Sequence, residues 1–235
     1  MRNREKIIIS MVKSVVLSVG FLFFFVFCLM TMTWADQPTT VEEKKVTMSF
    51  ISLPKPEIEK NQLMKSLNLR RTETIFGSKE LTQQVLSDLL WAGFGVNRED
   101  GKRTAPSAMN WQEIDIYVIM ESGAYVYDPK ENTLMAVAVG DLRSLAGQQA
   151  FVATAPLNLI YVADYSKMIG TDPENQSLYA NADTGFISQN VYLFCASEGL
   201  VTVVRGSVDR QALAEVLKLP DNKKITLAQT VGYPE

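Results

Sequence analysis

The chain has 235 residues, a formal net charge of −3 and no histidine. Ser-His-Asp hydrolysis, Cys-His proteolysis and histidine-ligated zinc or haem all need an imidazole, so the missing histidine excludes these classes of protein, and no metal site is expected. The acidic balance gives no basic surface for a nucleic acid, so no nucleic-acid partner is expected either.

The first 35 residues have the pattern of an export signal. Four basic residues precede an apolar run over residues 15–30, and the tripeptide 33–35 has a spacing that suits cleavage after Ala35. This pattern predicts a signal peptide over residues 1–35 and an exported, periplasmic protein. The alternative is an uncleaved membrane anchor, because an apolar stretch of roughly 18 residues spans a bilayer. Contact of the mature protein with a membrane is expected only through this segment, and only if it is not cleaved.

The remainder is expected to be a linker or arm over residues 36–54 and one domain over residues 55–235. The apolar segment Val46–Leu53 ends at prolines and favours a short edge strand or an extended arm. Removing residues 1–35 takes away four basic residues and one acidic residue, which leaves about six net negative charges. Cys195 is then the remaining cysteine, so an internal disulfide is excluded.

The first half of the domain is predicted to contain two helices and a meander. Apolar residues recur with the helical period over residues 57–68 and 82–92, and Gly93 is expected to stop the second helix. Three apolar, strand-like runs follow, separated by turn-forming residues, and they predict an antiparallel meander. The three runs are Ile114–Met120, Ala124–Tyr127 and Leu134–Val139.

The second half is predicted to contain a helix over residues 141–154, a buried central strand over 157–163 and a long helix. That helix is expected to begin at Asp183 or Thr184 and to end at Glu198. Its apolar residues point in nearly every direction, so it belongs in a core or a subunit interface. Helices and strands without strict alternation indicate an α+β fold. The last predicted elements are a strand over 200–204, a helix over 209–217 and a strand over 225–231.

Three segments carry polar groups that suit a ligand. Arg70-Arg71-Thr72 follows a helix, and two guanidiniums beside a hydroxyl hold a phosphate dianion well. Pro106, Ser107 and Asn110 lie before the meander, where small and polar groups can meet the edge of a ring. Arg205-Gly206 places backbone amides at the end of a strand. Taken alone, the arginine pair is more often solvated surface and the 106–110 segment more often a connecting loop, and Arg205-Gly206 can be a plain strand-to-helix turn.

Five pieces of sequence occur in order between Lys55 and Pro234. Together they resemble the nitroreductase family, in the branch related to the SagB-type azoline oxidases of peptide-modifying systems. The first piece is similar to the Arg-Arg-Ser phosphate motif of that family. The pieces are Arg70-Arg71-Thr72, Leu89-Leu90-Trp91-Ala92, Arg103 to Ala108, Asp183 to Asn190, and Val231-Gly232-Tyr233-Pro234.

The resemblance implies a nitroreductase-like α+β fold, with a central mixed or antiparallel sheet flanked by helices. It also implies an obligate-type homodimer that packs through its long central helices and holds FMN between the two subunits. Two departures from relatives stand out. Relatives often have basic residues after the final strand, where this chain ends at Glu235, and Leu178 precedes Tyr179 where azoline oxidases have a Lys-Tyr pair. The second departure argues against azole formation.

By position, the resemblance implies that Arg70 and Thr72 meet the FMN phosphate and that Gln148 supplies an amide to the flavin. The loop over residues 106–110 lines the ring, in part from the partner chain. Backbone groups of Arg205 and Gly206 face the N5 region. The expected cofactor-binding residues are Arg70, Arg71, Thr72, Pro106, Ser107, Asn110, Gln148, Arg205 and Gly206.

The implied function is that of an FMN-dependent oxidoreductase, in which the flavin takes hydride from a reduced donor and passes electrons to a second small molecule. The ring carries the chemistry, so no catalytic side chain is assigned. Because nicotinamide nucleotides are cytoplasmic, the electron donor of an exported enzyme can instead be a quinol, a thiol or an electron-transfer partner. Two alternatives stay open: a non-catalytic flavin-binding or electron-relay module, and an exported binding domain without flavin.

Overall fold

The computed structural model describes residues 51–235, of which Lys55–Glu235 form one compact unit. The predicted signal peptide and most of the predicted arm lie outside the described residues. Ile51, Leu53 and their neighbours are exposed and belong to no helix or strand. Within residues 51–235, every helix is too short or too polar to span a bilayer.

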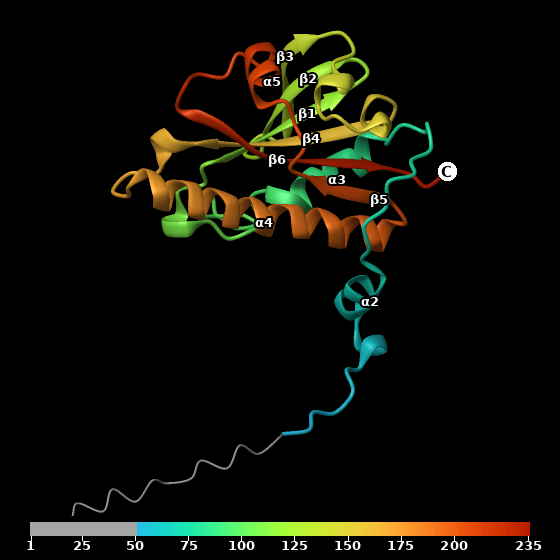
Figure 1. Ribbon diagram of the computed structural model, residues 1–235. Helices are drawn as coiled ribbons and strands as arrows, with labels where there is room; N and C mark the ends of the chain where they lie inside the picture. Colours follow the sequence, from blue (N-terminus) through green and yellow to red (C-terminus); the bar gives the residue numbers. More distant parts are fainter. Residues whose placement is uncertain (1–50) are drawn as a thin grey trace, which may run out of the picture. The chain divides into compact units, whose positions relative to one another are not determined.

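A six-stranded sheet forms the centre of the described unit, in the order β3-β2-β1-β4-β6-β5 (Figure 1). Every pair of neighbouring strands is antiparallel. The predicted meander and the predicted buried central strand are confirmed, and the sheet is antiparallel rather than mixed. The strands are β1 (Ile114–Met120), β2 (Gly123–Asp128), β3 (Thr133–Val139), β4 (Leu157–Asp164), β5 (Val201–Arg205) and β6 (Lys223–Gly232).

Helices cover both faces of this sheet (Figure 1). Side chains alternate along β1, as strand geometry requires. Ile116 and Val118 pack into the core beneath α3 and α4, whereas Tyr117 and Ile119 pack into a second core with α5. The α-helices are α2 (Gln62–Leu69), α3 (Gln83–Phe94), α4 (Pro173–Glu198) and α5 (Arg210–Val216).

The predicted start of the long helix at Asp183 or Thr184 is wrong, because α4 begins at Pro173 and has 26 residues. The Asp172 side chain caps it by accepting the Asn175 N–H at 3.0 Å. Proline at the first helical position fits because its missing N–H would be unpaired there anyway. The first turns of α4 are polar, so a pattern of recurring apolar residues does not reveal them.

The predicted helix over residues 141–154 is also wrong. The segment contains two short 3₁₀ turns instead, Arg143–Leu145 and Ala150–Ala153. The Ala146 carbonyl accepts a hydrogen bond from Arg205 Nη1 at 3.0 Å. A β-carbon at Gly147 would overlap the same guanidinium. A side chain from a distant strand therefore occupies the room that a continuous helix would need.

Gly93 does not end α3, which continues to Phe94 and is capped by Gly95. A β-carbon at Gly93 would lie 3.2 Å from Val191 Cγ2, so this glycine lets α3 approach α4 closely. The helix predicted over residues 57–68 is interrupted at Asn61, whose side chain accepts the Met64 N–H at 3.0 Å and caps α2. A 3₁₀ turn precedes it.

Candidate functional site

The arginine motif lies where α2 ends, against the C-terminal half of α4. The Arg70 N–H donates to the Ser66 carbonyl at 2.8 Å and closes the helix. The Arg70 guanidinium lies over the Tyr192 ring, 5.4 Å from its centroid, in a cation–π geometry. The Thr72 and Tyr192 hydroxyls are 3.0 Å apart. The Tyr192 hydroxyl also accepts the Val204 N–H at 3.0 Å, so one tyrosine joins the motif to β5.

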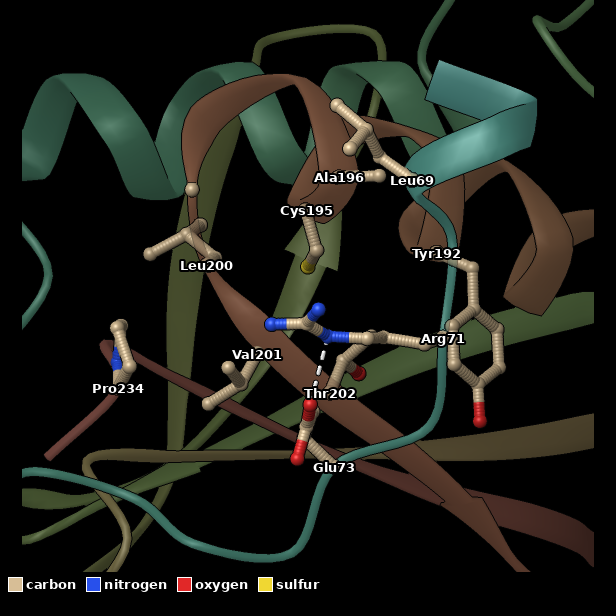
Figure 2. Close-up of a pocket in the computed structure, with 11 residues that line it drawn as sticks. Leu69, Arg71, Glu73, Tyr192, Cys195, Ala196, Leu200, Val201, Thr202 and Pro234 are labelled. Atoms are coloured by element: carbon tan, nitrogen blue, oxygen red, sulfur yellow. Dashed lines mark ion pairs between the residues drawn. The ribbon is translucent and has the colours of Figure 1, made fainter. Parts of the chain in front are cut away.

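Arg71 points elsewhere. Its Nε lies 2.6 Å from a carboxylate oxygen of Glu73, and its side chain is 75% exposed. Both residues line a cavity of ≈230 Å³ beside Thr202 of β5, and Figure 2 shows the ion pair at its edge. Glu73 therefore offsets the charge of Arg71, whereas Arg70 has no such carboxylate among residues 51–235. The two arginines of the motif are not equivalent.

The end of β5 carries a buried cation. The Arg205 guanidinium donates to Thr230 Oγ1 at 3.2 Å, to the Ala146 carbonyl at 3.0 Å and to Asn158 Oδ1 at 3.1 Å. Burial lowers the pKa of Arg205 to about 10, so it remains charged at neutral pH. The side chain thus points inward, and Gly206 leaves the strand as an exposed residue.

Gln148 lies beside the turn that follows β5. The Ser207 hydroxyl donates to Gln148 Oε1 at 3.0 Å, and both residues are exposed. The structure therefore brings Gln148 and Gly206 together at one end of β5. Thr72 is joined to the same strand through Tyr192.

The loop that contains Pro106, Ser107 and Asn110 forms a second group of predicted site residues. These residues line a cavity of ≈260 Å³ together with basic residues of the preceding loop. The Ala108 N–H donates to Asp183 Oδ2 of α4 at 2.8 Å. Asp183 and Tyr192 are separated by about 13 Å along the axis of α4, given the rise of an α-helix. In one chain the predicted site residues thus form two separate groups.

Sequence reasoning missed the acid beneath this loop. The Ser107 hydroxyl donates to Glu113 Oε2 at 3.1 Å, and Glu113 is fully buried. Burial, and secondarily the nearby Asp183 carboxylate, raise the pKa of Glu113 to about 7. The available signal was a glutamate directly before the apolar strand Ile114–Met120. Tyr192 was missed as well, because it lies on a helix that is apolar on most sides.

Comparisons with known proteins agree with this architecture. Residues 67–233 match the profile of the nitroreductase family. A candidate nitroreductase of Methanocaldococcus jannaschii is 34% identical over 176 residues, which span 71% of this chain and 89% of that protein. The NADPH-flavin oxidoreductase of Vibrio harveyi is 30% identical over 103 residues, or 40% of this chain and 43% of that protein. The crystal structure of a candidate nitroreductase from Ralstonia eutropha is similar with a TM-score of 0.71 and 41% identity, over 79% of this chain and 89% of that chain. The chain belongs to the nitroreductase family.

Proposed function

We propose that the chain is an exported oxidoreductase that moves electrons from a reduced small-molecule donor, through bound FMN, to a second small molecule. Family membership and the similarity to a flavin oxidoreductase support the reaction class. The signal-like pattern over residues 1–35 supports export. The observation that carries the cofactor proposal is that Arg70, Thr72 and the end of β5 all contact Tyr192.

The groups around Tyr192 suit a phosphate. Arg70 lies at the end of α2 with its guanidinium unpaired by any carboxylate of the described unit, and Thr72 adds a hydroxyl at an exposed position. A guanidinium binds a phosphate dianion through short, charge-assisted hydrogen bonds. Arg71 is held by Glu73. We therefore expect Arg70 to be the principal phosphate anchor and Arg71 to contribute less.

The site needs a second copy of the chain. The two cavities lined by predicted site residues measure ≈230 and ≈260 Å³, less than the roughly 300–1,000 Å³ of a typical ligand pocket. On the outer side of α4, Leu178 and Phe186 are 61% and 48% exposed. An apolar strip of this kind marks an interaction surface. A homodimer formed through α4 would bury the strip and bring a loop of one subunit towards the arginine motif of the other.

The protein's contribution to the reaction is position and electrostatics. When bound, FMN supplies the hydride and electron transfer. Arg70 and Thr72 would hold its phosphate, and the amides of Asn110 and Gln148 would offer hydrogen bonds to the polar edge of the ring. Gly206, which has no side chain, leaves room for a flat ligand to approach the end of β5.

The acceptor is proposed to be a small molecule rather than a peptide azoline. Leu178 and Tyr179, which occupy the positions of the Lys-Tyr pair of azoline oxidases, both lie in α4. A leucine at the first of these positions has no amine to move a proton. An exported enzyme also works apart from cytoplasmic peptide-modifying systems.

Binding of flavin by single-site variants tests the cofactor proposal. Loss of a hydrogen bond to a charged group costs about 1.5–3 kcal/mol, so Arg70→Ala is expected to weaken FMN binding about tenfold or more. Binding of riboflavin, which lacks the phosphate, should not change. Arg71→Ala is the matched control and should have a smaller effect. Unchanged FMN binding in Arg70→Ala would remove the phosphate assignment.

An absorbance spectrum and an anaerobic titration test the rest of the proposal. The purified protein should show a flavin spectrum that is bleached by a nicotinamide nucleotide, a quinol or a thiol. A yellow protein that none of these reductants bleaches would instead favour a non-catalytic flavin-binding module. A colourless protein whose melting temperature does not rise with added FMN would contradict the cofactor itself.

A further inference from the structure

The loop over residues 107–112 is held in an unfavourable backbone conformation. Met109, Asn110 and Gln112 have positive φ angles of 49°, 56° and 48°. Residues with side chains rarely adopt this left-handed region, and they stay there only when neighbouring contacts hold them. Three such residues within four positions therefore require strong anchors nearby.

Two buried carboxyls supply those anchors. The Ser107 hydroxyl donates to Glu113 Oε2 at 3.1 Å, and the Gln112 N–H donates to the Ser107 oxygen at 2.8 Å. The Ala108 N–H donates to Asp183 Oδ2 at 2.8 Å. Glu113 is 0% exposed and Asp183 is 2% exposed. Adjacent residues of one loop are thus tied to two neighbouring acids, one before β1 and one in α4.

One oxygen of this arrangement has no partner. Glu113 Oε1 is buried and accepts no hydrogen bond within the part of the chain that the structure describes. An ionised carboxylate is costly there, and a second carboxylate beside it makes ionisation costlier still. A proton on Oε1 removes both costs, because it neutralises Glu113 and gives it a donor towards Asp183.

The other charged groups near this loop make no contact with the Glu113 carboxyl group. Arg103 Nε donates to Gln112 Oε1 at 2.8 Å, and Lys167 Nζ donates to the Gln112 carbonyl at 3.2 Å. Asp164 meets Glu113 only through its backbone N–H, which donates to the Glu113 carbonyl at 2.9 Å. The carboxylate of Asp183 is therefore the charge that governs the side chain of Glu113.

We propose that Glu113 and Asp183 share one proton and that this proton holds the 107–112 loop in the conformation that lines the flavin site. The part that concerns flavin rests on the proposed function. As pH rises, the proton leaves Glu113 Oε1 for solvent and two adjacent carboxylates remain. Their repulsion separates the two anchors, and the strained loop relaxes. In a chain without histidine, this pair makes the site responsive to pH near neutrality.

Trp111 reports the state of this loop without any ligand. It follows Asn110 directly, and its ring packs edge-on against Tyr179 with centroids 5.8 Å apart. We would measure fluorescence from about pH 5 to about pH 9 and subtract the spectrum of the Trp111→Phe variant to isolate its emission. One transition is expected, with a midpoint near the Glu113 pKa of about 7.

Three variants decide whether the transition belongs to the carboxyl pair. Glu113→Gln keeps the shape of a protonated glutamate and should abolish the transition. Asp183→Asn removes the second carboxylate, so ionisation of Glu113 no longer causes repulsion between the two anchors, and the transition should also be lost. Glu198→Gln, at the exposed end of α4, is the control and should leave it unchanged. A transition that survives in Glu113→Gln, or no transition in the unsubstituted protein, overturns the proposal.

Flavin binding at two pH values tests the second part. Dissociation constants of FMN and riboflavin would be measured at about pH 5.5 and about pH 8.5. We expect at least about threefold weaker binding of both ligands at the higher pH, and no such change in Glu113→Gln. Because riboflavin lacks the phosphate, a change in its affinity with pH cannot come from titration of the FMN phosphate. Absence of flavin binding at every pH would contradict the proposed function, whereas the Trp111 transition decides the shared proton independently. A Trp111 transition without any change in affinity would overturn the link between loop and flavin.

Discussion

The hydroxyl groups of Thr72 and Tyr192 lie 3.0 Å apart and connect the arginine motif to α4, the longest helix within residues 51–235. The same tyrosine supports the Arg70 guanidinium with its ring and accepts the Val204 N–H with its oxygen. One side chain of α4 therefore fixes the position of three elements: the end of α2, the segment that carries Thr72, and β5.

Tyr192→Phe is expected to weaken FMN binding about fivefold, because it keeps the ring beneath Arg70 but removes an oxygen that holds Thr72 and Val204. The estimate corresponds to about 1 kcal/mol for a partly buried hydrogen bond. Equilibrium titration with FMN measures it. Tyr125→Phe, which loses an exposed hydrogen bond to Ser122, is the control and should bind FMN normally. Equal affinities in all three proteins would refute the role of the Tyr192 hydroxyl.

Glu113 is expected to make the protein less stable as pH rises from about 4.5 to about 7. Its pKa is raised from 4.5 to about 7 in the folded chain. In this window the unfolded chain has released the proton and the folded chain still holds it, so the free energy of unfolding decreases with pH. The full loss is about 3 kcal/mol. Urea unfolding at both pH values should show this decrease in the unsubstituted protein relative to Glu113→Gln. If the difference in the free energy of unfolding between the two proteins is the same at both pH values, the raised pKa of Glu113 is contradicted.

Gly147→Ala is expected to destabilise the protein by roughly 2 kcal/mol or more, because its β-carbon would occupy the place of the Arg205 guanidinium. Arg205→Met is also expected to destabilise, since it removes the donor to the buried Thr230 oxygen and to the Ala146 carbonyl, and leaves Asn158 Oδ1 with Thr230 alone as its donor. In the double variant the overlap disappears. Its loss of stability in urea should therefore be smaller than the sum of the two single losses, and strict additivity would count against the contact.

The strands were predictable from sequence because their signals are local. Alternating apolar residues and turn-forming residues place the meander without any knowledge of the rest of the chain. The error over residues 141–154 has a tertiary origin, since Arg205 takes up the space at Gly147 and the carbonyl of Ala146. The start of α4 did have a local signal in Asp172-Pro173, but apolar periodicity does not detect a signal of this kind.

In the candidate site too, features with a local sequence signal were predictable and features that depend on tertiary contacts were not. The arginine motif and the 106–110 loop could be proposed from the sequence because contiguous residues carry their chemistry. The pairing of Glu113 with Asp183 was not predictable, because the two acids lie 70 positions apart and meet only when β1 packs against α4. The different surroundings of Arg70 and Arg71 also depend on the fold, which places Tyr192 under one and Glu73 beside the other.

Phe186→Asp is expected to dissociate the proposed homodimer and to abolish FMN binding. The side chain is 48% exposed on the outer side of α4, near the middle of the helix. A charge there would lose its water on burial in an apolar interface, at a cost of several kcal/mol that short-range contacts would not offset. Light scattering during size-exclusion chromatography measures the mass directly.

Met135→Asp provides the matched control for this change. Met135 is 53% exposed, but it lies on the edge strand β3 rather than on α4, so the same charge should leave both the dimer and the cofactor in place. Retention of the dimer mass and of FMN in Phe186→Asp would place the subunit interface elsewhere. Loss of FMN from a Phe186→Asp protein that is still dimeric would mean that α4 acts on the flavin within one chain. A folded monomer without FMN is the expected result, because each chain carries the arginine motif and the 107–112 loop in two separate groups.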